Sequence, residues 1–175
     1  IPAAQKAQRS GVGLMLTVED ISFSYKEKPV LEKVGLQVKK GEIIGILGPN
    51  GCGKTTLLKL LNRNLHPNAG KVLMEGTDLE EISKRRIARH IAVVPQSNEI
   101  RFAFSVRDIV TMGRMPFLDR FQGESSEDMA IVDEAMAKTN ITAFADRLIN
   151  TMSGGERQRV IIARALAQRP EVILL

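Results

Sequence analysis

The chain has 175 residues and a net charge of +5, and 43% of its residues are hydrophobic. This composition allows a substantial core and excludes disorder over most of the chain. A single cysteine, Cys52, excludes an internal disulfide and is typical of a reducing compartment. The two histidines, His66 and His90, have no Cys or His at ligand spacing, which argues against a zinc site. No apolar run approaches the length of a membrane span, and we expect no secretory signal.

The basic charge is compatible with nucleic acid, an anionic membrane surface or a phosphate-bearing ligand as partner. The densest basic stretch is Lys84–Arg86, followed by Arg89. Isoleucines interleave with these charges at helical spacing, so we interpret the stretch as the solvent-facing side of an amphipathic helix. Only 4% of the residues are aromatic, which argues against a stacking platform, and we expect no nucleic-acid partner.

The N-terminal part of the chain has the pattern of strands. Residues 1–13 are small, polar and basic, and we expect a flexible tail there. Apolar residues alternate over 14–25 and again over 34–38, which predicts antiparallel strands with one solvent-facing side. Residues 43–47 are apolar without alternation, which is typical of a central parallel strand covered on both faces.

Helices and strands then alternate, which favours an α/β core. A leucine stripe predicts a helix over 54–65, ending before Pro67. A short strand over 71–74, a helix over 79–90 and a buried strand over 91–94 follow.

The stretch from Ser105 to Asn150 has no strand-like run and indicates an inserted helical subdomain. Ser105 and Asp108 have the spacing of a capping box, and Ser125 opens a second helix. A helix over 153–168 and a strand over 171–175 return to the core.

Residues 48–55 read GPNGCGKT and fit the pattern G-x-x-x-x-G-K-[ST] in full, between an apolar strand and an amphipathic helix. The glycines let backbone N–H groups surround a phosphate, and the helix presents its positive end to the same anion. We expect Lys54 to contact the β- and γ-phosphates and the Thr55 hydroxyl to bind Mg²⁺. The candidate nucleotide-binding residues are Gly48, Pro49, Asn50, Gly51, Cys52, Gly53, Lys54, Thr55 and Thr56.

A second motif, SGGERQ, starts at Ser153 and directly precedes a helix. Ser153 and Glu156 have capping-box spacing, which by itself indicates only an ordinary helix start. The two intervening glycines, Gly154 and Gly155, are not needed for a capping box. They clear space at the helix N-terminus, where a phosphate is the natural ligand.

Three features in this order resemble an ATP-binding cassette (ABC) ATPase domain: the loop at 48–55, Gln96 at the end of a core strand and the motif at 153–158. The resemblance covers 14–175. It implies an α/β fold: a P-loop NTPase core with an N-terminal antiparallel β subdomain and an inserted helical subdomain. The nucleotide-binding core is expected over 14–96 and 152–175, and the helical subdomain over 97–151.

The resemblance also assigns roles to residues. Tyr25 matches an aromatic that stacks on adenine, with a cross-strand structural aromatic as the equal alternative. Gln96 matches a glutamine that contacts Mg²⁺ and the attacking water, and with Lys54 it is the expected catalytic pair. Ser153, Gly154, Gly155 and Glu156 match the signature that closes over ATP bound by a second subunit. The implied assembly is a head-to-tail pair of ATPase subunits.

A finer resemblance rests on the run from Ser105 to Pro116, followed by Glu127-Asp128. It is similar to ATPases of bacterial importers for iron–siderophore, haem and cobalamin complexes. Such subunits bind integral-membrane permeases through the helical subdomain, at the cytoplasmic face of the membrane. We therefore expect a permease partner and a peripheral location.

Alternatives remain open. One is a soluble ABC ATPase acting on DNA or ribosomes, and another is an unrelated P-loop kinase in which the second motif is coincidental. Cys52 is either a small filler of the loop or an acidic thiol whose alkylation blocks nucleotide binding. No catalytic role is expected for it, because phosphoryl transfer to water needs no protein nucleophile.

The last residues, 172–175, resemble the Walker B strand of the family. In that family an Asp-Glu pair follows the strand, and a histidine follows further on. We therefore expect the 175-residue polypeptide alone to bind nucleotide weakly and not to hydrolyse ATP.

Overall fold

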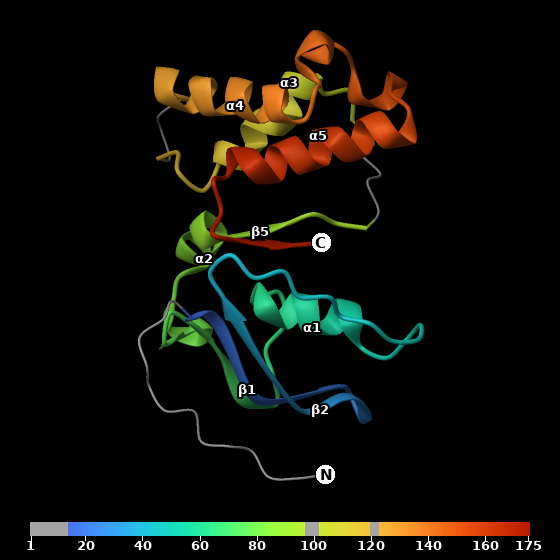
Figure 1. The fold of residues 1–175 in the computed structure, drawn as a ribbon, viewed down its shortest axis with the longest axis vertical. Helices are drawn as coiled ribbons and strands as arrows, with labels where there is room; N and C mark the ends of the chain where they lie inside the picture. The colour runs from blue at the N-terminus through green and yellow to red at the C-terminus, as the bar shows by residue number, and fades with distance from the viewer. Residues whose placement is uncertain (1–13, 97–101, 120–122) are drawn as a thin grey trace. The chain divides into compact units, whose positions relative to one another are not determined.

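The computed structural model describes residues 14–96, 102–119 and 123–175 (Figure 1). Two compact units make up the described chain; the first ends at Ile82 and the second begins at Ser83. The tail expected at 1–13 lies outside the described residues.

An antiparallel sheet forms most of the first unit. Its strands are β1 (Leu14–Tyr25), β2 (Lys28–Lys39), β3 (Ala69–Met74) and β4 (Thr77–Asp78), in the order β2-β1-β3-β4. The alternating pattern therefore predicted the β1–β2 pair correctly, although β2 begins earlier than expected. The sheet contributes these buried apolar residues to the core of the unit: Leu16, Val18, Ile21, Phe23, Leu31, Val72 and Met74.

Helix α1 (Lys54–Leu61) buries Leu57, Leu60 and Leu61. The helix was predicted to continue to Leu65, and this end is wrong. Arg63 adopts a left-handed backbone with φ of 56°, and the amides of Asn64 and Leu65 both donate to the carbonyl of Lys59. This geometry satisfies the last helical carbonyls and ends the helix early.

The predicted central strand over 43–47 is absent from the described structure. Ile43 is 98% exposed and Leu47 is 94% exposed, and none of the described strands pairs with this run. A strand is stable only when neighbouring strands satisfy its backbone groups, so apolar character alone does not make one.

The helix predicted over 79–90 is two shorter elements. The 3₁₀ helix η1 (Leu79–Glu81) closes the first unit, and α2 (Lys84–His90) opens the second. The break occurs because Ser83 has an extended backbone, with φ of −61° and ψ of 145°, and its side chain caps the amide of Arg86. A serine at this position starts a new helix rather than continuing the old one.

Two short strands, β5 (Ile91–Val93) and β6 (Val172–Leu174), pair in parallel in the second unit. Their pairing confirms the predicted strands over 91–94 and 171–175. The amide of Val94 adds a hydrogen bond of 2.8 Å to the carbonyl of Leu174.

Helices make up the rest of the second unit, and α3, α4 and α5 pack together in it (Figure 1). Serine N-caps with complete capping boxes open all three of these helices, which confirms the helix starts expected from the spacing. The elements are α3 (Val106–Thr111), η2 (Met112–Arg114), α4 (Ser126–Lys138), η3 (Thr142–Phe144), η4 (Ile149–Thr151) and α5 (Gly154–Ala167).

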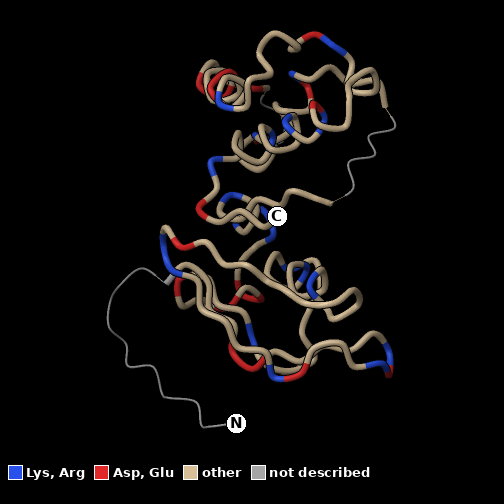
Figure 2. The backbone as a smooth tube through the Cα atoms, turned by 45° about the vertical axis from the view of Figure 1, so that its right-hand side comes forward, with Lys and Arg blue, Asp and Glu red and all other residues tan. Residues whose placement is uncertain are grey.

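Basic residues of α2 have structural contacts in addition to solvent exposure. Arg85 Nε and Arg89 Nε each donate to the carbonyl of Pro116 at 2.9 Å, and Arg89 also lies over the ring of Phe117. Lys, Arg, Asp and Glu are otherwise distributed along both units (Figure 2). None of the helices in the described ranges is long and apolar enough to cross a membrane.

Candidate nucleotide-binding site

The loop over 48–53 folds around the side chain of Lys54. The ammonium Nζ donates to the carbonyl oxygens of Gly48 and Pro49, both at 2.8 Å, and lies 3.8 Å from Cys52 Sγ. A further turn is closed by the amide of Cys52, which donates to the carbonyl of Pro49 at 3.4 Å. The loop therefore holds a positive charge next to the N-terminus of α1.

Helix α1 begins without the cap that the longer helices of the chain have. Its N-cap is Gly53, with φ of 96°, and no side chain of the described residues accepts from its first amides. The first turn also contains no acidic residue. These amides and the helix dipole are thus available to an anion, and the phosphate contact expected from the sequence stays a prediction.

Position 53 requires glycine both because its φ is positive and because there is no space for a Cβ atom. A Cβ at this position would lie 2.8 Å from Leu31 Cδ2 and 3.1 Å from Val30 Cγ1. This close approach joins the loop to the start of β2. Tyr25 lies opposite Lys28 at the end of the same hairpin, so Tyr25 and the candidate phosphate loop at 48–55 belong to one unit.

Tyr25 retains both interpretations given above. Its side chain is 46% exposed, and its ring contacts Phe23 edge-on at a centroid distance of 4.8 Å. The packing on Phe23 is structural, while the exposed part of the ring is available to a base.

The second motif lies at the N-terminus of α5 in the second unit. The amide of Ser153 donates to Glu156 Oε2 at 2.7 Å, and the amide of Glu156 donates to Ser153 Oγ at 3.3 Å. The hydrogen bonds from Ser153 are the main cause that lowers the pKa of the Glu156 carboxyl, which is therefore ionised at neutral pH. A Cβ added at Gly154 or Gly155 would meet no heavy atom within 4 Å, so this side of the turn is open.

Gln96 is exposed and follows the buried residue Val94, just beyond β5. Its position at the end of a core strand agrees with the sequence prediction, and its contact with a metal or water stays a prediction. Gln96 and the motif at 153–156 belong to the second unit, whereas Tyr25 and the phosphate loop belong to the first.

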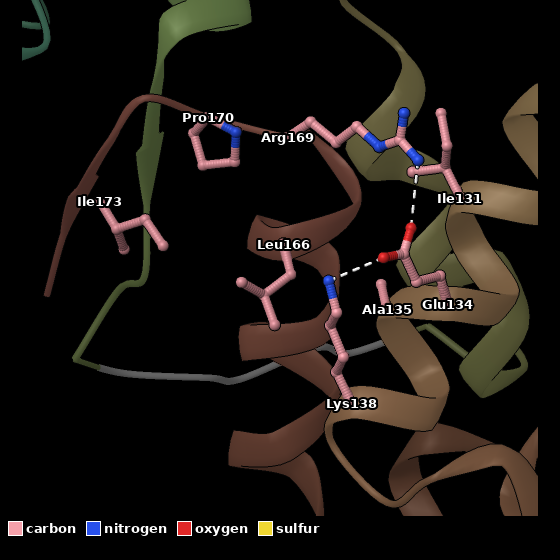
Figure 3. Close-up of a pocket in the computed structure, with 8 residues that line it drawn as sticks. All are labelled: Ile131, Glu134, Ala135, Lys138, Leu166, Arg169, Pro170 and Ile173. Atoms are coloured by element: carbon pink, nitrogen blue, oxygen red, sulfur yellow. Dashed lines mark hydrogen bonds and ion pairs between the residues drawn. The ribbon is translucent and has the colours of Figure 1, made fainter.

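A shallow groove in the second unit contains none of the predicted site residues (Figure 3). In this groove, the Glu134 carboxylate forms ion pairs with Lys138 at 2.8 Å and with Arg169 at 3.1 Å. The hydrogen bond from Lys138 is the largest cause that lowers the pKa of Glu134, followed by that from Arg169. The groove is lined by Ile131, Glu134, Ala135, Lys138, Leu166, Arg169, Pro170 and Ile173.

One residue near the second motif was not predicted from the sequence. Arg147 donates to the carbonyl of Thr151 at 2.9 Å and lies 3.8 Å from Glu156 Oε1. No motif marks this arginine, and only its contacts with the turn before α5 identify it.

Comparison with known proteins places these features in a family. The ABC transporter family model matches residues 31–175. Cobalamin import ATP-binding protein BtuD of Halobacterium salinarum is 46% identical over 162 residues, which cover 93% of this chain and 40% of that protein. Iron(3+)-hydroxamate import ATP-binding protein FhuC of Bacillus subtilis is 37% identical, over 91% of this chain and 60% of that protein.

A solved structure of an ABC transporter component has a similar fold. The structure of cbiO1 from Clostridium perfringens, part of the ABC transporter complex cbiONQ, aligns with a TM-score of 0.79 at 28% identity. The alignment covers 92% of this chain and 64% of that one.

The chain thus spans 40% of the length of one curated relative and 60% of the other. The predicted α/β class, with a P-loop NTPase core, is confirmed, and the alternative of an unrelated P-loop kinase is excluded. By its family match, its relatives and its fold, this chain belongs to the ABC transporter family.

Proposed function

We propose that the protein containing this chain is the ATP-binding and hydrolysing subunit of an ABC importer for an iron–siderophore or related metal chelate. The observation that carries the nucleotide site is the uncapped N-terminus of α1 beside the Lys54 ammonium. An anion at this point gains free amides, a helix dipole and a full positive charge together.

Lys54 is the residue that acts on the transferring phosphoryl group. Its ammonium is held by two loop carbonyls, and a phosphate that enters the loop offers stronger, charge-assisted hydrogen bonds in their place. A positive charge placed there in advance stabilises the negative charge that develops during phosphoryl transfer.

Mg²⁺ fits the oxygen donors of this region. The exposed hydroxyl of Thr55, in the first turn of α1, is the group of the first unit that would hold it, and the predicted contact of Gln96, in the second unit, with the ion is a separate expectation. When bound with ATP, the ion supplies charge neutralisation of the phosphates.

The open turn at Gly154 and Gly155 supports a head-to-tail pair of subunits. In such a pair, this turn would close over the phosphates of ATP held in the loop of the other subunit. The pair would act on integral-membrane permease subunits at the cytoplasmic face of the membrane, and the helical region over 97–151 would be the contact.

The substrate class is supported by relatives whose names specify cobalamin and iron(3+)-hydroxamate import. Both cargoes are metal chelates, so this shared chemistry is the class proposed here.

The nucleotide site is tested by Lys54→Ala in the full-length protein, with MgATP affinity measured by isothermal titration calorimetry. We expect a loss of at least about tenfold, because a charge-assisted contact contributes about 1.5–3 kcal/mol. The matched control is Lys59→Ala, which removes an exposed lysine from the last turn of the same helix. Equal affinities for Lys54→Ala and the wild type would overturn the assignment.

The transport role is tested by growth and uptake. A strain lacking the gene should fail to import iron complexed to a hydroxamate siderophore or to import cobalamin, and the wild-type gene should restore import whereas Lys54→Ala should not. Unchanged import of both chelates in the deletion strain would overturn the proposed substrate class.

A further inference from the structure

The turn before α5 is held by one guanidinium. Arg147 Nε donates to Thr151 Oγ1 at 3.2 Å, and Arg147 Nη2 donates to the Thr151 carbonyl at 2.9 Å. The same guanidinium lies over the ring of Phe144, 5.8 Å from its centroid. Arg147 therefore fixes the backbone two residues before Ser153.

Arg147 also reaches the start of the helix itself. Its Nη1 lies 3.8 Å from Glu156 Oε1, while the other carboxylate oxygen, Oε2, accepts from the amide of Ser153. One side chain thus connects the turn, through Thr151, to the capping carboxylate, through Glu156.

The carboxylate of Glu156 presents an electrostatic problem for the proposed function. It is an ionised acid in the first turn of a helix whose N-terminus is to approach the phosphates of ATP. A like charge beside the bound phosphate would oppose its binding, and the charges of Arg147 and Arg159, which both act on this carboxylate, reduce the repulsion.

We propose that Arg147 is a positioning residue for the nucleotide-binding turn at 153–155, which acts by holding and neutralising Glu156. The inference rests on the proposed function, in which this turn binds ATP held by a second copy. Arg147 itself does not contact nucleotide. Its two contacts keep the backbone of Ser153 in place and leave the open side of Gly154 and Gly155 free for a phosphate.

The test is Arg147→Gln in the full-length protein, because glutamine removes the charge and keeps a donor for the Thr151 carbonyl. We expect the KM for ATP in steady-state hydrolysis to rise about two- to fivefold, in the range of a charge acting at a helix terminus. Nucleotide affinity of the separated subunit, which depends on the phosphate loop, should stay within about twofold of the wild type.

A double-mutant cycle identifies the route through which Arg147 acts. The second variant is Glu156→Gln, which retains the capping-box geometry without the negative charge. If Arg147 acts through Glu156, adding Arg147→Gln to Glu156→Gln should change the KM by less than about twofold. An equal rise in KM in both backgrounds would show a role independent of Glu156 and overturn the proposal, as would no rise in the wild-type background.

A matched control separates positioning from general stability. Arg107→Gln removes another guanidinium of the same unit, whose ion pair is with Asp133 of α4 at 2.6 Å. It should leave the KM unchanged. If Arg107→Gln raises the KM as much as Arg147→Gln, the effect is structural and the inference is wrong.

The same assay distinguishes failure of the underlying function. Hydrolysis that is absent in the wild type, or equal in Lys54→Ala, would overturn the proposed ATPase and the inference with it. Hydrolysis that depends on Lys54 with no response to Arg147→Gln would overturn the inference alone.

Discussion

Arg114 and Asp128 form an ion pair inside the second unit, with Arg114 Nε 2.9 Å from Asp128 Oδ1. Arg114 is 6% exposed and Asp128 is 9% exposed. Arg114 Nη1 also donates to the carbonyl of Ala167 at 2.9 Å, and Asp128 accepts from Ser125 at the start of α4. One pair therefore joins η2, α4 and the end of α5.

The first prediction concerns this pair. Asp128→Ala should lower the free energy of unfolding by about 3–5 kcal/mol, because it leaves a buried guanidinium without its carboxylate. Urea denaturation followed by circular dichroism measures the change. A matched control is Asp133→Ala, which breaks an exposed pair and should cost less than about 1 kcal/mol. Similar losses for both variants would contradict the assigned role of burial.

The pair also predicts a dependence on pH. The hydrogen bond from the Ser125 side chain, and then that from Arg114, lower the pKa of Asp128 from 3.8 to about 2. A carboxyl with a lowered folded-state pKa stabilises the fold fully above its unfolded pKa and loses this contribution as the pH falls through its folded pKa. Stability from Asp128 should therefore decline between about pH 4 and pH 2, and Asp128→Asn should show a shallower decline in that window.

Gly53 is expected to be essential for nucleotide binding. Gly53→Ala places a Cβ against Leu31 and Val30 and forces a side chain onto a backbone with φ of 96°. We expect ATP affinity to fall at least about tenfold, since the loop must shift to relieve a clash and a strain of about 1–3 kcal/mol. Gly41→Ala is the control, because its φ is 77° but nothing lies within 4 Å of its Cβ. It should lower stability slightly and leave ATP affinity unchanged in fluorescence titrations.

Gly113 is expected to matter for stability alone. A Cβ there would meet the backbone oxygen of Arg164 and, at 3.1 Å, the Cβ of Ala167, so Gly113→Ala should lower the free energy of unfolding by about 1–3 kcal/mol. Gly123→Ala has open space around its Cβ and should change stability by less than about 0.5 kcal/mol. Thermal melts of both variants would decide the question; equal melting temperatures would show that η2 and α5 can separate without cost.

The two interpretations of Tyr25 can be separated by ligand choice. If the ring stacks on adenine, Tyr25→Ala should weaken ATP binding by about five- to hundredfold, the effect of about 1–3 kcal/mol for stacking on a base. Tyr25→Phe should retain most of the affinity, and binding of inorganic triphosphate should be the same in all three proteins. Equal losses for ATP and triphosphate would indicate a structural role through the contact with Phe23.

Local patterns predicted elements well where the cause of the element is itself local. Serines that cap helices, such as Ser105 and Ser125, mark helix starts because the capping hydrogen bonds span only three residues. The contacts of Lys54 with the loop before it are local in the same way, since its ammonium donates to the carbonyls of Gly48 and Pro49, and the role of this loop as a nucleotide site stays a prediction.

Prediction failed where the outcome depends on distant chain or on competing local contacts. The run at 43–47 has the composition of a buried strand, but a strand also needs partners that no local pattern specifies. The helix expected over 79–90 has suitable periodicity throughout, and the cap by Ser83 outweighs it. The contacts of Arg147 were not predictable from sequence because surface arginines are common and its partners, Thr151 and Glu156, follow it without a recognisable spacing pattern.

The C-terminal end of helix α5 is held by hydrogen bonds to α2 and β5. Gln168 Nε2 donates to the carbonyls of Ala88 and Ile91, and His90 pairs with Glu171 at 3.0 Å, directly before β6. The helix is about 20 Å long, and these contacts attach its last turn to α2 and β5. If the turn at Gly154 and Gly155 moves on nucleotide binding, as proposed, α5 would carry that displacement from its first turn to the paired strands β5 and β6.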